Sequence, residues 1–187
     1  MRIRWFNAIR VYGLFLVMGY HLFQGIFPGG FLGVEIFFTV SGYLTTAVII
    51  EEMRNKDGFS IMRFYKRRAQ RIMIPLVFMV VFTLPLILLI SPDFMVNIAQ
   101  KAAAALSFTT NWAEIASGGS YEAQLLPSMY IHTWSLAIEM QFYIVWGLIC
   151  AGLAAVAEYF YKKSGNKRVI FFKTLIFIVS AVLAVGS

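Results

Sequence analysis

Five long apolar segments, separated by short polar and basic stretches, constrain the fold of this chain more than any other feature. They cover residues 8–27, 31–50, 72–90, 133–157 and 169–187. A helix needs about 20 residues, at ~1.5 Å each, to cross the ~30 Å hydrocarbon layer of a bilayer. With 60% of 187 residues hydrophobic and 13% charged, the chain has more apolar surface than a soluble core needs. We therefore predict an all-α, polytopic membrane helical bundle of about five transmembrane helices.

The basic residues predict how these helices are oriented. Of the 16 lysines and arginines, all but Lys101 lie in the N-terminal part up to Arg10, in residues 51–71 or in residues 158–173. These three regions share one side of the membrane only if residues 94–110 do not cross it. The positive-inside rule then makes that side, and the N-terminus, cytoplasmic. We predict that residues 94–110 form an extra outer interfacial helix, or one half-buried against other helices.

Composition also excludes several classes of protein. A net charge of +7 would suggest nucleic-acid binding in a soluble protein, but here the charges gather between apolar runs, so no nucleic acid is expected. The single cysteine, Cys150, cannot form an intrachain disulfide, and no metal site is predicted. The N-terminus is not read as a secretory signal, because Arg10 and His21 interrupt its apolar run and no small-residue cleavage site follows.

Residues 10–43 carry ionisable groups within apolar surroundings. Placing such a group at the centre of a membrane helix costs roughly 2.5–3.5 kcal/mol of insertion free energy, so each is expected to have a binding partner or a function. Arg10 and His21 are 11 residues apart and share one helix face about 16 Å long. We expect the Pro28-Gly29-Gly30 turn to return Glu35 to about the depth of His21, where its carboxylate could orient the imidazole. The alternatives are a snorkelling Arg10 and a buried structural ion pair.

The same residues resemble the start of acyltransferase family 3. In this chain they read R-V-Y-G-L-F-L-V-M-G-Y-H, followed by F-L-G-V-E-I-F-F-T-V-S-G-Y-L. The resemblance implies that His21 is the catalytic histidine and Glu35 the acidic residue beside it. It also implies substrate-binding roles for Arg10 and for Ser41 and Tyr43 of the S-G-Y sequence.

A second block of the resemblance lies in the basic stretch before the third apolar run. Arg68, Arg71, Ile72 and Pro75 match the family's R-x-x-R-I-x-P sequence. Guanidinium groups bind phosphates bidentately, and coenzyme A carries a 3′-phosphate and a diphosphate. Arg68 and Arg71 are therefore expected to hold acetyl-CoA, the donor substrate. The alternative is that these charges only set membrane topology and contact lipid.

The third block opens the fourth apolar run. Residues 134–143 match the W-S-L-x-x-E-x-Q-F-Y signature at every fixed position, and the resemblance implies substrate-binding roles for Trp134, Ser135 and Glu139. Helical spacing puts Glu139 on one face with Ser135 and Trp146, so its carboxylate should point to a protein interior. The alternative role for Glu139 is to hold helices together.

Together the three blocks resemble most closely the peptidoglycan O-acetyltransferases of Gram-positive bacteria. That likeness implies a bacterial, multi-pass cell-membrane enzyme that moves acetyl groups from cytoplasmic acetyl-CoA to hydroxyls of a cell-surface glycan. No permanently bound cofactor is expected; the partners are the lipid bilayer, the donor, the glycan and an extracytoplasmic transferase domain. Such proteins have further membrane helices, so residues 1–187 are expected to be the N-terminal portion of one acyltransferase domain.

The residues leave two questions open. His21 could act as a general base, or as a nucleophile through an acyl-imidazole. A different class of function also fits the hairpin charges, namely a transporter or lipid-handling scaffold in which His21 and Glu35 form a proton relay. A third possibility is an inactive fragment.

Overall fold

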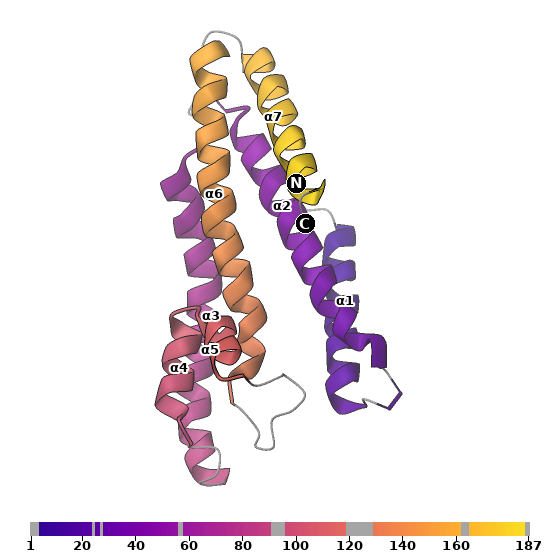
Figure 1. Ribbon diagram of the computed structural model, residues 1–187, viewed down its shortest axis with the longest axis vertical. Helices are drawn as coiled ribbons and strands as arrows, with labels where there is room; N and C mark the ends of the chain where they lie inside the picture. The colour runs from indigo at the N-terminus through magenta and orange to yellow at the C-terminus, as the bar shows by residue number, and fades with distance from the viewer. Residues whose placement is uncertain are drawn as a thin grey trace. The chain divides into compact units, whose positions relative to one another are not determined.

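A computed structural model describes residues 4–23, 25–26, 28–55, 58–90, 96–118, 129–161 and 165–185. In these residues the fold is all-helical, with no strand. The chain divides into two compact units: residues 1–59 with 153–187, and residues 60–152. Figure 1 shows the helices of both units, and α6 (Trp134–Tyr161) runs from the second unit into the first.

The predicted fold class, an all-α membrane helical bundle, is confirmed. Four helical stretches of the described chain are long and apolar enough to cross a membrane: Pro28–Glu52, Ile61–Ile87, Ile131–Tyr161 and Asn166–Val185. The helix α1 (Arg4–Leu22) is not among them, although the sequence predicts a span there. Its 19 residues include Asn7, Arg10 and His21, which lower its hydropathy.

In the first unit, α1 and α2 (Leu32–Glu52) form a hairpin whose backbones touch. A short 3-10 turn, η1 (Pro28–Phe31), leads into α2. A side chain at Gly33 would meet the carbonyl oxygen of Gly13, and one at Gly30 would meet that of Leu16. Small residues allow such close approach of membrane helices, and we call these contacts the glycine seam. It sets how far α2 reaches along α1.

Arg168 ties the other end of α2 to α7 (Gly165–Val185). Its guanidinium donates to the backbone oxygens of Met53 and Asn55 at 2.9 and 3.0 Å, just past the end of α2. The carboxylate of Glu158, near the end of α6, lies 3.8 Å away. A cation at a helix C-terminus satisfies terminal carbonyls and complements the helix dipole. One arginine from the second basic segment is therefore structural; Lys162 and Lys163 of that segment lie outside the described residues.

In the second unit, α3 (Ile61–Ile90) packs on α6 through aromatic side chains. The Phe64 and Tyr143 rings meet edge to face at 6.5 Å, and the Tyr65 hydroxyl donates to the carbonyl oxygen of Ile144 at 2.8 Å. Gly147 leaves room for this packing, because a Cβ there would lie 2.8 Å from the Tyr65 ring. The first half of α3 is therefore held firmly against α6.

The ambiguous residues 94–110 contribute a short helix, α4 (Ile98–Leu106), which precedes α5 (Thr110–Ala116). Nine residues extend only about 14 Å, too short to cross a bilayer. Ala102 and Ala105 of α4 are buried in a cluster with Leu76 and Val80 of α3. The structure thus supports the prediction of a helix half-buried against its neighbours.

The basic stretch before the third apolar run is not a loop throughout, although the sequence predicts one. Within residues 51–71, α3 already begins at Ile61, and it continues through Pro75 and Pro85. Arginine and lysine are good helix formers, and the basic stretch simply extends the apolar helix by three turns. As a result Arg68 and Arg71 are on a rigid element.

Candidate active site

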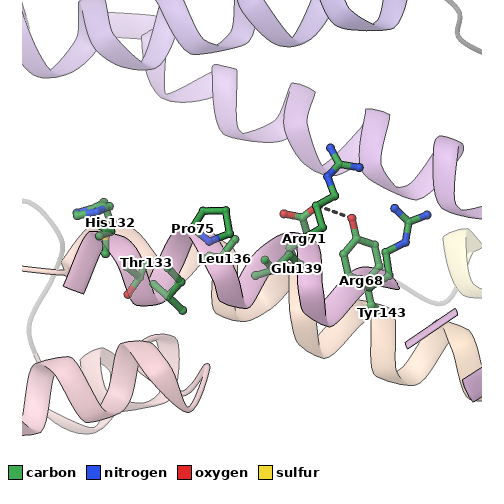
Figure 2. Close-up of a pocket in the computed structure, with 11 residues that line it drawn as sticks. Arg68, Arg71, Pro75, His132, Thr133, Leu136, Glu139 and Tyr143 are labelled. Atoms are coloured by element: carbon green, nitrogen blue, oxygen red, sulfur yellow. Dashed lines mark hydrogen bonds between the residues drawn. The ribbon is translucent and has the colours of Figure 1, made fainter. Parts of the chain in front are cut away.

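A cavity of about 510 Å³ lies along α3 and α6 in the second unit. Its size falls within the roughly 300–1,000 Å³ range of small-molecule sites. Figure 2 shows its lining side chains, with Arg68 and Arg71 near one end and His132 at the other. The full lining is Arg68, Arg71, Ile72, Pro75, Leu76, Met79, His132, Thr133, Leu136, Glu139 and Tyr143.

Two guanidinium groups mark one end of this cavity. Arg68 lies over the rings of Phe64 and Tyr143, 5.5 and 5.1 Å from their centroids, in cation–π contacts. Arg71, one turn further on, is exposed. Among the described residues neither guanidinium takes part in an ion pair or hydrogen bond. Their N–H donors are therefore available to an anionic ligand, and the aromatic rings hold Arg68 in place.

The carboxylate of Glu139 is held beside the arginines by Tyr143. The Tyr143 hydroxyl donates to Glu139 Oε1, one turn away on α6, as the dashed line in Figure 2 indicates. Glu139 is half-buried and lines the cavity, as the helical spacing of the motif indicates. This bond holds the carboxylate against Tyr143, and neither Arg68 nor Arg71 forms an ion pair at contact distance within the described chain.

Apolar side chains line the middle of the cavity, and η3 (Ile131–Thr133) closes its other end. The Thr133 hydroxyl donates to the Tyr130 carbonyl oxygen at 2.7 Å and bonds the Thr110 hydroxyl at 2.9 Å. Thr133 is therefore a structural group that fixes η3. His132, beside it, is exposed and lines the cavity.

In the first unit the structure brings two of the predicted binding residues, Arg10 and Ser41, together. Arg10 on α1 donates to the hydroxyl of Ser41 on α2 at 3.4 Å, and Ser41 is 4% exposed. Tyr43 is exposed, and its ring contacts that of Phe6 at 4.9 Å between centroids. The predicted face of α1 therefore contacts the S-G-Y sequence of α2 through Arg10.

The predicted pairing of His21 and Glu35 is not formed. Both are exposed, and no hydrogen bond or ion pair joins them in the described residues. Gly33 lies against Gly13 and Val17, which leaves His21 roughly 10 Å further along α1. Glu35 follows Gly33 in the opposite direction, so the predicted equal depth is wrong. The glycine seam sets this register, and the His21 ring instead meets Tyr20 edge-on at 5.4 Å.

The remaining predicted residues, Trp134 and Ser135, lie at the start of α6. Trp134 lines a second, mostly apolar cavity of about 290 Å³ with Ile115 of α5. Ser135 donates its hydroxyl to the carbonyl oxygen of His132 at 3.2 Å. Gln141 of the same signature bonds Asn111 and the carbonyl oxygen of Phe108, which ties α5 to α6. Part of the signature therefore has a structural role.

Two residues that line the larger cavity were missed from the sequence. Tyr143 reads as an interface aromatic, but it contacts Arg68 and Glu139 at once. His132 lies two residues before the signature and is not part of the matched motif. The only sequence signal for either is its one-turn or two-turn spacing from Glu139 on α6.

Comparison with known proteins identifies a family that covers nearly the whole chain and relatives that match about three quarters of it or more. A family model described as an acyltransferase domain matches residues 3–186. The O-acetyltransferase OatA of Staphylococcus aureus strain NCTC 8325 is 33% identical over 143 residues, covering 76% of this chain and 24% of that protein. The peptidoglycan O-acetyltransferase OatA of Listeria monocytogenes is 33% identical over 141 residues, covering 75% and 23%.

A putative O-acetyltransferase of Staphylococcus aureus strain COL is 33% identical over 156 residues, covering 83% of this chain and 25% of that protein. The chain thus spans about a quarter of the length of these curated relatives. No solved structure matches it significantly.

Proposed function

This chain belongs to acyltransferase family 3, and from that membership we propose that it provides the membrane part of a bacterial O-acetyltransferase. The donor is acetyl-CoA on the cytoplasmic side, where the N-terminus lies, and the acceptor is a hydroxyl of a cell-surface glycan of the peptidoglycan type. The names of the relatives support the acceptor class. The proposal extends to an extracytoplasmic transferase domain as the partner that receives or completes the transfer.

The observation that carries this proposal is the pair of guanidinium groups without ion-pair partners in the described part of the α3–α6 cavity. Guanidinium groups without a contact ion pair can bind an anion, and phosphate groups match their fork geometry. Arg68 and Arg71 bind the phosphates of acetyl-CoA, and the apolar middle of the cavity takes the arm that carries the thioester. Glu139 and Tyr143 keep Arg68 in position.

His21 carries the central step of transfer. It acts as general base on the acceptor hydroxyl, or as the nucleophile that takes the acetyl group first. In either case the new bond forms at the acetyl carbonyl carbon, the carbon–sulfur bond breaks, and the coenzyme A thiol leaves with the proton lost by the nucleophile. Arg10, hydrogen-bonded to Ser41, contributes a further cation on the same face of α1.

A His21–Glu35 proton relay, as a transporter would need, has less support. Such a relay requires hydrogen-bond reach, directly or through one water, whereas the register of the glycine seam offsets the two residues by roughly 10 Å along the hairpin.

The test is acetyl-CoA binding and acetyl transfer in membranes that contain the full-length protein. Arg68→Ala and Arg71→Ala should each weaken binding by roughly 10-fold or more, since a hydrogen bond to a charged group contributes about 1.5–3 kcal/mol. The matched control is Arg63→Ala, an exposed arginine on the same helix that does not line the cavity. Binding that survives both substitutions, or the absence of binding by the wild type, would refute the proposal.

A further inference from the structure

The chain contains two histidines, and the resemblance assigns only His21. The second, His132, lines the α3–α6 cavity together with Arg68 and Arg71. We propose that His132 is a further catalytic residue: it meets the thioester end of the donor and donates a hydrogen bond to the acetyl carbonyl oxygen. This inference rests on the proposed use of the cavity for acetyl-CoA.

The geometry of the cavity gives it two chemically distinct ends. Tyr143 lies beside Arg68, and His132 is 11 residues earlier in the chain, which corresponds to roughly 16 Å along the helix axis. Figure 2 shows the arginines and His132 at opposite ends, with Pro75 and Leu136 between them. A donor with a phosphate end and a reactive end joined by a long arm fits this order of groups.

Near the second end, the Thr133 hydroxyl bonds Tyr130 and Thr110, and the Ser135 hydroxyl bonds the carbonyl oxygen of His132, so both hydroxyls hold the local fold. The His132 side chain lines the cavity at this end. An imidazole N–H is a good donor to an oxygen that gains negative charge.

The chemical step places this hydrogen bond where charge develops. When the nucleophile adds to the acetyl carbonyl carbon, the oxygen becomes an oxyanion, which His132 stabilises. The carbonyl then re-forms as the carbon–sulfur bond breaks, and the thiol leaves with the proton released by the nucleophile. His132 ends the cycle with the proton it began with, so it needs no further reactant.

The experiment compares His132→Ala, His132→Gln and wild type in membranes that carry the full-length protein. Radiolabelled acetyl-CoA binding and acetyl transfer are both measured. His132→Ala should lower the turnover rate by roughly 100-fold to 1,000-fold, the usual loss when one oxyanion donor is removed. Donor affinity should change by less than about 3-fold, because the phosphate end supplies the binding. His132→Gln keeps an N–H donor and should recover part of the rate.

The outcomes separate this inference from the proposed function. Normal turnover in His132→Ala, together with lost binding in Arg68→Ala, would overturn the role of His132 and leave the donor site standing. Loss of donor binding in His132→Ala, or equal loss in His132→Ala and His132→Gln with a lowered melting temperature, would make His132 structural and also overturn the inference. If the wild type itself does not bind acetyl-CoA, both proposals fail together.

Discussion

The α1–α2 hairpin and the α3–α6 pair solve the packing of two membrane helices in opposite ways. In the hairpin, glycines let the backbones touch, and the candidate reactive side chains His21 and Glu35 lie exposed outside that contact. In the α3–α6 pair, aromatic rings fill the interface, and polar side chains gather around a cavity. The first arrangement presents candidate reactive groups on an exposed surface, and the second arranges polar groups around a cavity.

This difference shows which functions each region can perform alone. Arg68 is held by two rings, and Glu139 by a tyrosine, within one pair of helices. A preorganised set of this kind can bind a ligand without further partners. His21 is exposed on α1, and its ring meets that of Tyr20 on the same helix. We therefore expect binding and chemistry to respond separately to substitutions in the two regions.

The largest difference between the effect on acetyl transfer and the effect on donor binding is expected for His21→Ala. Removing a general base or nucleophile should lower surface O-acetylation by at least about 100-fold, because such groups contribute roughly 10²–10⁴ in rate. Acetyl-CoA binding should stay at the wild-type level, since the donor cavity lies along α3 and α6. Leu22→Ala, at the exposed neighbouring position, is the control. Wild-type acetylation in the His21 variant would remove the hairpin from the chemistry.

The glycine seam can be broken directly with Gly33→Ala. In most helix interiors this change stabilises by about 0.5–1 kcal/mol. Here the new Cβ would collide with the Gly13 carbonyl oxygen, so we expect a loss of roughly 1–3 kcal/mol and a lower melting temperature in detergent. Gly29→Ala, where a Cβ meets nothing within 4 Å, should melt like the wild type. If Gly33→Ala and Gly29→Ala had the same melting temperature, the close backbone contact at Gly33 would not be needed for stability.

The corresponding change in the α3–α6 pair is Arg68→Lys. Lysine keeps the charge but loses the planar fork that stacks on Phe64 and Tyr143. Donor affinity should fall by roughly 5-fold to 10-fold, about 1 kcal/mol, while Arg63→Lys leaves it unchanged. Binding assays on both variants check this. Unchanged affinity in Arg68→Lys would mean that charge alone holds the donor.

The smallest effect is expected for Tyr65→Phe. This substitution removes the hydrogen bond to the Ile144 carbonyl oxygen but keeps the ring against Gly147. A loss of about 0.5–1.5 kcal/mol in unfolding free energy, with no change in donor binding, is the expected result. A change in binding would show that the cavity depends on this polar contact as well as on aromatic packing.

The hydrophobic pattern predicted the membrane-helix class and four of the five spans, because length and apolarity leave few alternatives in a bilayer. The pattern missed the start of α3, because a stretch of basic residues is compatible with either a loop or a helix. The contact between Arg68 and Tyr143 that accompanies the helix is not visible in the sequence. The pattern also could not set the register of the hairpin. Gly13, Gly30 and Gly33 determine that register, and a glycine carries no hydrophobic signal.

Motif matching singled out Arg68, Arg71 and Glu139 as binding residues without placing them in one cavity, and the structure shows all three lining the same cavity. It did not find Tyr143 or His132 as lining residues, because their relation to the arginines exists only across two helices that are distant in sequence. The pairing of His21 with Glu35 was expected from the turn at Pro28-Gly29-Gly30, from chemical complementarity and from the family resemblance. Complementary groups meet only when backbone packing allows it, and here the glycine seam holds them apart.

The seam also bears on how the hairpin responds to bilayer thickness. Backbones in direct contact cannot slide by one residue, because the neighbours of Gly33 carry side chains that the seam has no room for. Arg10 and His21 lie about 16 Å apart along α1 because of the helix rise, and the seam makes α2 move with them. A thinner or thicker membrane can tilt this unit but does not shift α2 along α1.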